Sequence, residues 1–228
     1  MELYDPAPAL HLLEWHRKLR YPYLCRFGGA RLKITKGVFC PTFTHASSLL
    51  LASVQFEPGR RVLDVFSGSG AFAILAALSG AHAVAVDISA SAAECAIANA
   101  ALNGVQDEVD VRLGTLEDCV SRTEKFDLIV ANPPLLPSRG EIPKDDLEAA
   151  VYDPDFRATV GFFNEVGYHL DRRGRCYIVT SDVLDRAGHD VDRLCIDRGL
   201  AGSLVAKLDV GYETYRVHEL TLTCEPSP

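Results

Sequence analysis

Short apolar runs alternate with longer stretches of helical periodicity through most of the chain after residue 60. Short apolar runs bounded by turn residues are typical of buried strands, whereas apolar positions that recur every three to four residues indicate helices. The short runs predict strands at 61–66, 82–87, 109–113, 126–131, 175–181, 203–208 and 216–224. The periodic stretches predict helices near 71–79, 90–103, 157–170 and 183–199. Because strands and helices alternate, the pattern predicts an α/β fold with a doubly wound, seven-stranded, mostly parallel sheet.

The two ends of the chain depart from this alternation. The last two predicted strands follow each other across Gly211, which predicts an antiparallel C-terminal hairpin. At the other end, apolar positions at helical spacing predict a helix over 9–20, and two alternating runs around Gly28-Gly29 predict a β-hairpin. We therefore expect an N-terminal helix-and-hairpin extension over 1–45 that caps the substrate, and a main domain over 46–228 that opens with a helix.

Composition adds limits on compartment and partners. The chain has 228 residues, 48% of them hydrophobic, and a net charge of −8, which argues against a general binder of duplex nucleic acid. Its seven cysteines form an odd, scattered set without a C-x-x-C pair, which predicts a reduced, cytoplasmic protein without a metal site. These cysteines are residues 25, 40, 95, 119, 176, 195 and 224. The N-terminus does not resemble a signal peptide, and no apolar run is long enough to span a bilayer.

One segment has a charge opposite to that of the whole chain. Between Trp15 and Phe56 the sequence holds seven Lys or Arg residues and no Asp or Glu. Two interpretations stay open. The charges either protect the exposed edge of the hairpin, or they form a face that attracts a carboxylate or phosphate of the substrate.

Residues 62–72 carry a clear chemical signal. An apolar strand leads into Gly68-x-Gly70 and then into an apolar helix. The glycines permit a tight turn and the close approach of a ligand, and the helix start offers free N–H groups and a partial positive charge. By itself this pattern indicates a nucleotide-like ligand, and NAD fits it as well.

Acidic and amide side chains follow the neighbouring strands. Asp64 lies four residues before Gly68, where it suits a cationic group such as an α-ammonium. Asp87 ends the next strand, where its carboxylate can accept hydrogen bonds from ribose hydroxyls. The strand over 126–131 runs into Asn132-Pro133-Pro134-Leu135. This combination favours a cofactor other than NAD.

Together these segments resemble class I S-adenosylmethionine-dependent methyltransferases of the Asn-Pro-Pro-aromatic group, which includes HemK/PrmC-type glutamine methylases and N6-adenine methylases. The match runs over about residues 30–228. It implies a Rossmann-like fold and S-adenosylmethionine as the cofactor. It also implies the residues that bind this cofactor, which are Asp64, Phe66, Ser67, Gly68, Gly70, Asp87, Ile88, Leu116 and Asn132.

Asn132 and Pro133 are the candidate catalytic residues. Methyl transfer to a planar nitrogen requires that its lone pair point toward the methyl group, and two oxygen acceptors that hold its N–H groups achieve this and stabilise the growing charge. The Asn132 side-chain oxygen and the Pro133 carbonyl can supply these acceptors. Leu135 replaces the aromatic residue usual in the family, so the site lacks a surface for base stacking.

The predicted function is therefore an S-adenosylmethionine-dependent N-methyltransferase that modifies an amine or amide nitrogen of a small-molecule or amino-acid-like substrate. The predicted substrate-binding residues are Phe43, His45, Leu135, Tyr152 and Asp153, of which the last two resemble part of a Tyr-Glu-Pro motif of glutamine methylases. One alternative is a methylase of a protein glutamine or of an adenine in RNA. The others are an NAD-dependent oxidoreductase and a non-catalytic cofactor-binding protein.

Overall fold

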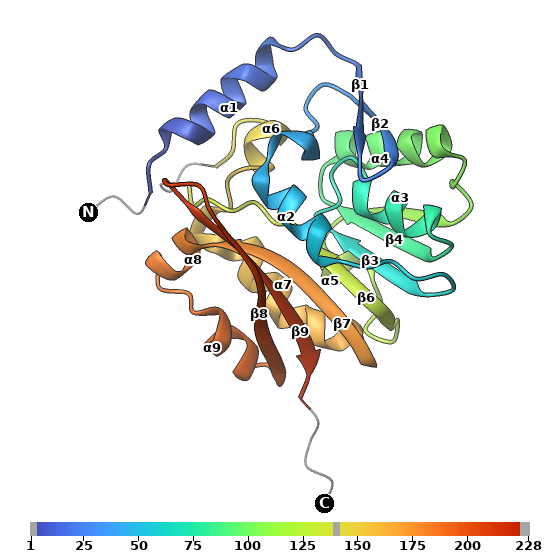
Figure 1. Ribbon diagram of the computed structural model, residues 1–228, viewed down its shortest axis with the longest axis vertical. Coiled ribbons are helices and arrows are strands. Elements are labelled where there is room, and N and C mark those ends of the chain that lie inside the picture. Colours follow the sequence, from blue (N-terminus) through green and yellow to red (C-terminus); the bar gives the residue numbers. More distant parts are fainter. Residues whose placement is uncertain (1–3, 139–141, 224–228) are drawn as a thin grey trace, which may run out of the picture.

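A seven-stranded sheet forms the centre of the computed structural model, which describes residues 4–138 and 142–223 (Figure 1). The strand order is β5-β4-β3-β6-β7-β9-β8, in which β5, β4, β3, β6 and β7 are parallel and the β9–β8 pair adds an antiparallel edge. The strands are β3 (Arg61–Val65), β4 (His82–Asp87), β5 (Val109–Leu113), β6 (Phe126–Ala131), β7 (Leu170–Ser181), β8 (Leu200–Asp209) and β9 (Thr214–Leu222). The predicted fold class is confirmed. Cys224, the last residue of the predicted final strand, lies outside the described residues.

Helices cover both faces of this sheet because successive strand residues point to opposite sides. Val62 packs into the hydrophobic cluster on one face, and Leu63 and Val65 pack into the cluster on the other. The first face carries α2 (His45–Ser53), α3 (Ala71–Leu78) and α4 (Ala90–Asn103). The second carries α5 (Leu116–Cys119), α7 (Arg157–His169), α8 (Asp182–Arg186) and α9 (Val191–Ile196).

The N-terminal hairpin packs on the first helix layer. Its strands are β1 (Tyr23–Phe27) and β2 (Ala30–Ile34), and the buried residues of β2 join the same hydrophobic cluster as α3. Two amides of α4 bind its main chain: Asn103 Oδ1 accepts from Arg31 N at 2.9 Å, and Asn99 Oδ1 accepts from Lys33 N at 2.7 Å. The predicted division at residue 45 therefore crosses a continuous hydrophobic cluster.

Several element boundaries differ from the predictions. The helix predicted over 183–199 is two helices, α8 and α9, because Gly188 adopts a left-handed backbone with φ of +93°. Helix α1 (Ala7–Lys18) begins before the predicted residue 9, with proline in its first turn, where no intrahelical N–H bond is lost. A short helix, α6 (Asp146–Ala149), and two 3-10 turns, η1 (Pro41–Phe43) and η2 (Pro154–Phe156), were not predicted. In the described part of the chain, every helix is too short or too polar to cross a membrane.

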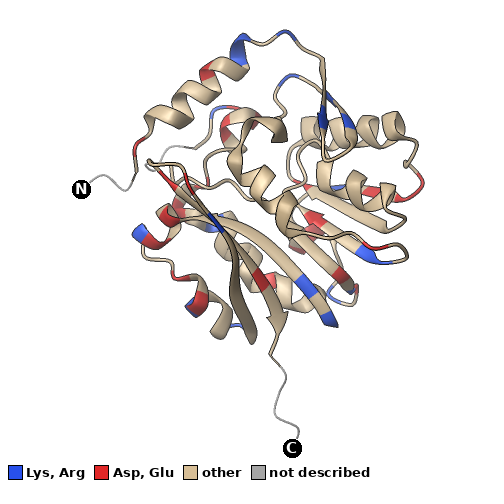
Figure 2. Ribbon diagram, in the orientation of Figure 1, with Lys and Arg blue, Asp and Glu red and all other residues tan. Residues whose placement is uncertain are grey.

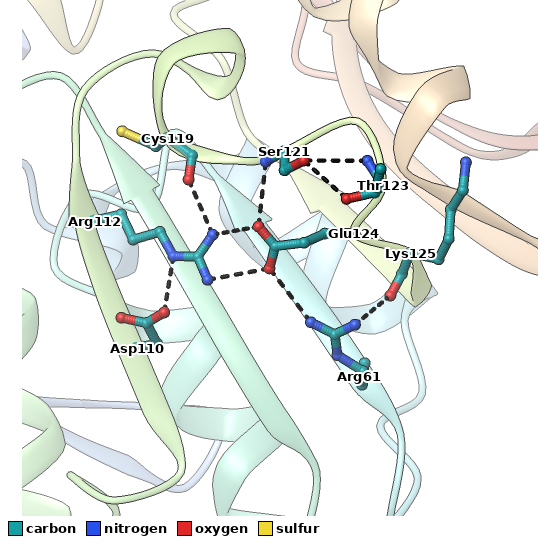
Figure 3. Close-up of polar contacts among 8 residues, drawn as sticks. All are labelled: Arg61, Asp110, Arg112, Cys119, Ser121, Thr123, Glu124 and Lys125. Atoms are coloured by element: carbon teal, nitrogen blue, oxygen red, sulfur yellow. Dashed lines mark hydrogen bonds and ion pairs between the residues drawn. The ribbon is translucent and has the colours of Figure 1, made fainter.

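A charged network braces the loop between β5 and β6 (Figure 3). Arg112 of β5 donates to the two carboxylate oxygens of Glu124 over 2.9 and 3.2 Å, and to the Cys119 carbonyl at the end of α5 over 2.9 Å. Arg61, at the start of β3, lies 3.5 Å from the same carboxylate. The bond from Arg112 is the main reason why the pKa of Glu124 is lowered. The network holds α5 close to the carboxyl end of β5.

Candidate functional site

A cavity of about 490 Å³ opens at the carboxyl ends of β3, β4 and β6. The turn after β3 lines it through residues 66–69, Asp87 and Ile88 line it from the end of β4, and Asn132 lines it from the end of β6. Ligands of doubly wound sheets bind at the carboxyl ends of the strands. The structure therefore brings together predicted cofactor residues that three different strands supply.

The turn after β3 has a left-handed backbone at three positions, with φ of +61° at Phe66, +52° at Gly68 and +77° at Gly70. Gly68 lines the cavity, and a Cβ at this position would meet no atom within 4 Å. A Cβ at Gly70 would instead lie 2.8 Å from the Cβ of Ala96 in α4. Gly68 thus leaves room for a ligand, whereas Gly70 permits the close packing of α4 on the turn.

Asp64 supports this turn and does not line the cavity. Its side chain is 1% exposed, and Oδ2 accepts a hydrogen bond from the backbone N–H of Ala73, in the first turn of α3, at 3.0 Å. Burial raises the pKa of Asp64 to about 7, although the bond from Ala73 opposes this rise. In this geometry Asp64 joins the start of α3 to β3 and does not reach the ligand space directly.

Asp87 holds both the turn and the start of α4. Its Oδ2 accepts from Gly68 N at 2.7 Å and its Oδ1 from Ser89 N at 2.9 Å. Burial raises the pKa of Asp87, and the bonds from Ser89 and Gly68 oppose that rise. Each carboxylate oxygen keeps a further lone pair for a ligand hydroxyl. Ile88, which is 71% exposed, and the buried Leu116 add apolar surface to the same cavity.

A second, smaller cavity of about 120 Å³ meets the first at Asn132. Both cavities are lined by Asn132, Ser47, Phe39 and Ala150. The remaining lining of the smaller cavity comes from distant segments. They are α1 with the residues before it, Thr44 and Ala46 at the start of α2, the loop residues Pro133, Leu135 and Leu136, Val151, Val183 of α8, and the turn between β8 and β9 with Tyr215. Asn132 therefore lies where a group in the larger cavity and a group in the smaller one can approach each other.

Among the described residues, one hydrogen bond holds the side chain of Asn132. Its Nδ2 donates to the Oγ of Ser47 in α2 at 3.0 Å, so its Oδ1 is the end of the amide that does not face Ser47. An amide oxygen accepts hydrogen bonds and cannot donate them. Asn132 can therefore present an acceptor to a ligand that carries N–H groups.

The model of one protein family, the methyltransferase small domain, matches residues 29–189. The chain belongs to this family. The match begins inside the N-terminal hairpin, between β1 and β2, and ends after α8. It confirms the predicted class of enzyme, an S-adenosylmethionine-dependent methyltransferase.

Relatives of this methyltransferase domain include enzymes named for protein substrates. The ribosomal protein L11 methyltransferase of Symbiobacterium thermophilum is 43% identical over 114 residues, which cover 48% of this chain and 36% of that protein. The release factor glutamine methyltransferase of Cereibacter sphaeroides is 31% identical over 150 residues, which cover 65% of this chain and 52% of that protein. The chain thus spans about a third to a half of the length of these relatives.

A solved structure shows the same fold. The Thermus thermophilus 16S rRNA N2 G1207 methyltransferase, in complex with S-adenosylmethionine and guanosine, superposes with a TM-score of 0.64 at 22% identity. The superposition covers 89% of this chain and 50% of that one. These neighbours support the predicted cofactor. They do not support the predicted small-molecule acceptor, because they are named for protein or RNA substrates.

The predicted substrate-binding residues of this methyltransferase domain separate into three groups. Leu135 lines the smaller cavity together with Asn132. Tyr152 and Asp153 line the larger cavity instead. Phe43 and His45 line neither cavity: Phe43 packs against Trp15 with ring centroids 4.3 Å apart, and His45 is exposed.

Both carboxylate oxygens of Asp153 accept hydrogen bonds from the start of α7. Its Oδ1 accepts from Ala158 N at 2.9 Å, and its Oδ2 accepts from both the N–H and the hydroxyl of Thr159, at 2.9 and 2.8 Å. The side chain is 2% exposed. Asp153 therefore satisfies free N–H groups in the first turn of α7, and its acidity does not by itself indicate substrate binding.

The loop after β6 contributes residues that the sequence did not predict. Asp146, in α6, accepts hydrogen bonds from Ser89 Oγ at 2.8 Å and from Ser91 Oγ at 2.5 Å, and it lines the larger cavity. From the other side, Arg17 of α1 donates to Asp145 at 2.9 Å and to Glu148 at 2.8 Å. Helix α6 thus links the N-terminal helix to the start of α4 across the rim of the cavity. No sequence motif marks these contacts, because the partners lie more than 50 residues apart.

Proposed function

We propose that this chain is an S-adenosylmethionine-dependent N-methyltransferase that modifies a side-chain nitrogen of a protein, with a glutamine amide as the favoured acceptor. The observation that carries the proposal is the position of Asn132, a residue that lines both the larger and the smaller cavity. The larger cavity would hold the cofactor and the smaller one the acceptor side chain.

The larger cavity fits S-adenosylmethionine in shape and chemistry. The open space beside Gly68 allows a ligand to approach the backbone of the turn. Asp87 offers free lone pairs for ribose hydroxyls, while Ile88 and Leu116 offer apolar surface to a flat base. When bound there, S-adenosylmethionine supplies an electrophilic methyl group on a positively charged sulfur.

The residues of the chain position the acceptor nitrogen. The Asn132 Oδ1 and the Pro133 carbonyl can each accept one N–H of a primary amide and so hold the amide plane with its nitrogen lone pair toward the methyl group. As the new N–C bond forms, positive charge grows on this nitrogen, and the two oxygens stabilise it because they are already in place. The bond between the methyl group and sulfur would break with its electron pair left on the sulfur, so S-adenosylhomocysteine would be the leaving group. The nitrogen then loses one proton to water to reach the neutral N-methylamide.

The smaller cavity and the relatives both favour a protein acceptor. Leu135 gives this cavity an aliphatic wall, which suits the methylene chain of a glutamine better than the face of a nucleobase. The Cereibacter sphaeroides relative is named as a methyltransferase of a release factor glutamine. Helix α1 adds Pro8, Ala9 and Leu12 to the same cavity. We propose on this basis that residues 1–45 contain the substrate cap.

The basic residues before residue 56 lie at the end of α1, in the loop that follows it and on or just after the β1–β2 hairpin (Figure 2). Arg26 and Arg31 occupy opposing positions on β1 and β2, and both are exposed. Neither arginine lines the smaller cavity. We therefore propose that these arginines contact parts of the substrate outside the smaller cavity and do not bind the acceptor amide.

Two measurements test the function. Isothermal titration calorimetry with S-adenosylmethionine and with NADH identifies the cofactor, and binding of NADH alone would contradict the proposal. Release of S-adenosylhomocysteine is then measured with purified release factor, ribosomal protein L11, glutamine peptides, free glutamine and transfer RNA. Turnover with a protein or peptide supports the proposed acceptor class, whereas turnover with RNA or free glutamine alone refutes it.

Asn132→Ala tests the role of the shared amide. We expect turnover to fall at least ~10²-fold, the usual cost of removing one preorganised polar group from a charged transition state. Affinity for S-adenosylmethionine should change only a few-fold, because the side chain lies at one edge of the larger cavity. A comparable loss of cofactor binding would mean that Asn132 supports the fold of the site and not the transfer step.

A further inference from the structure

The Asn132 amide can serve the reaction in only one of its two orientations. One end of an amide accepts hydrogen bonds and the other end donates them. A half-turn about the last side-chain bond would exchange the two ends and point N–H groups at the N–H groups of the acceptor. The protein must therefore hold this bond in the productive orientation.

Ser47 provides the contact that distinguishes the two ends. It lies in α2, is 1% exposed, and receives the Asn132 Nδ2–H at its Oγ over 3.0 Å. The same Oγ lies 2.8 Å from the Oγ of Thr44. Either hydroxyl of this pair can donate to the other. In the arrangement in which Ser47 donates its single hydroxyl proton to Thr44, its oxygen is left to accept. Only the N–H end of Asn132 then forms a bond with it.

Helix α2 keeps Ser47 in place. Thr44 is the N-cap of this helix, and its hydroxyl oxygen accepts the backbone N–H of Ser47 at 3.4 Å. The neighbouring Ala46 and Leu50 are 4% and 0% exposed and belong to the hydrophobic cluster on this face of the sheet. The N-cap at Thr44 and the buried neighbours in α2 therefore fix the position of Ser47.

We propose that Ser47 is a positioning residue for the methyl transfer: its hydroxyl orients Asn132 so that Oδ1 faces the acceptor nitrogen. This inference rests on the proposed function. It extends the site beyond the Asn-Pro-Pro motif to α2, in which Ser47 lies 21 residues before Gly68. It also assigns a role to α2, which lines both cavities through Ser47.

The first test observes the hydrogen bond itself and needs no acceptor. In a ¹⁵N-labelled sample, the side-chain N–H signals of Asn132 are assigned by their loss in Asn132→Ala. We expect Ser47→Ala to shift these signals and to speed their exchange with solvent at least several-fold. Ser53→Ala is the matched control, because in the described part of the chain the Ser53 Oγ bonds only to Leu49 O in the same helix, at 2.9 Å. Unchanged Asn132 signals in Ser47→Ala would overturn the inference.

The second test measures turnover with the protein acceptor that the panel above identifies. Ser47→Ala should lower kcat about 10-fold or more, with the KM for S-adenosylmethionine within about two-fold of the wild type. Ser47→Cys keeps the size of the side chain but accepts hydrogen bonds weakly, so it should resemble Ser47→Ala. Ser47→Thr keeps the hydroxyl and should recover most of the rate. A full rate in Ser47→Cys would assign Ser47 to packing alone and refute the proposal.

The two tests separate failure of this inference from failure of the proposed function. If wild-type enzyme methylates none of the acceptors, the proposed function fails, whatever the spectrum of Ser47→Ala shows. If wild-type enzyme is active and Ser47→Ala keeps its kcat, the proposed function stands and the positioning role fails.

Discussion

Alanine substitutions at Gly68 and Gly70 should differ in their effects, although the two glycines lie two residues apart in one turn. We expect Gly70→Ala to lower mainly the stability and Gly68→Ala to lower mainly the cofactor affinity. Both have a left-handed backbone, which costs an alanine about 1–2 kcal/mol. At Gly70 the new methyl group would lie 2.8 Å from the Cβ of Ala96 and 3.1 Å from its Cα. Overpacking of this kind typically costs a further ~1–3 kcal/mol. At Gly68 the methyl group would meet no protein atom within 4 Å and would occupy space in the larger cavity.

Gly70→Ala should therefore lose about 2–5 kcal/mol of unfolding free energy, and Gly68→Ala only about 1–2 kcal/mol. In a domain of this size each kcal/mol lowers Tm by about 2–4 °C. Cofactor affinity should show the reverse order. Gly68→Ala should weaken binding of S-adenosylmethionine at least ~10-fold, because its methyl group blocks the approach to the backbone, while folded Gly70→Ala should bind within a few-fold of the wild type.

Urea unfolding and isothermal titration calorimetry measure the two effects separately. A double-mutant cycle of Gly70→Ala with Ala96→Gly isolates the contact between the turn and α4, and we expect a coupling of about 1–3 kcal/mol. Equal stability losses in Gly68→Ala and Gly70→Ala would refute the packing argument. Wild-type cofactor affinity in Gly68→Ala would refute the assignment of the larger cavity to S-adenosylmethionine.

Three further substitutions test the charged groups of the site and its support. Burial raises the pKa of Asp64 from 3.8 to about 7, so between these pH values the folded state keeps a proton that the unfolded state releases. The unfolding free energy should therefore fall between about pH 4 and pH 7, by up to ~1.4 kcal/mol per pH unit. Asp64→Asn still accepts from Ala73 N and should lose this part of the slope in urea titrations; parallel slopes in both proteins would contradict the argument. The pKa of Glu124 is lowered by Arg112, so its contribution is present above its ordinary value of 4.5 and disappears as the pH falls through the folded-state value. Glu124→Gln should cost about 1–2 kcal/mol at pH 7 and nothing in strong acid, and an equal loss at both pH values would exclude the charge as its cause. Asp87→Asn should weaken S-adenosylmethionine binding at least ~10-fold by calorimetry, and unchanged affinity would mean that Asp87 only braces the turn.

The sheet could be predicted from sequence because each strand carries its own signal. The runs over 82–87 and 126–131 are mainly apolar, and the run over 109–113 alternates apolar and charged residues. The structure places β4, β6 and β5 over those same residues. Errors arose where one residue interrupts a pattern that otherwise continues. Gly188 lies inside apolar residues at helical spacing, and its left-handed backbone ends α8 there.

Side-chain roles were harder to predict, because an acid near a motif can serve the backbone as well as a ligand. Asp64 matches the family's first motif and Asp153 stands where its Tyr-Glu-Pro motif has Glu, yet their oxygens accept from backbone N–H groups in the first turns of α3 and α7. These bonds depend on where a helix begins relative to a strand, to within one residue. Sequence spacing cannot give that precision, since helix ends are the least certain part of such a prediction.

The residues of the smaller cavity were the hardest to predict from sequence, and the reason also concerns the choice of acceptor. Many residues of the larger cavity follow the ends of β3, β4, β5 and β6, so they recur along the chain as each strand ends. The smaller cavity combines α1, Ser47, Leu135 and the β8–β9 turn, which are up to about 200 residues apart and share no periodicity. These segments can change without disturbing the strands that line the larger cavity. Acceptor choice should therefore vary with α1 and the β8–β9 turn, while Asn132 and its hydrogen bond to Ser47 stay the same, because the geometry of transfer is common to every planar nitrogen.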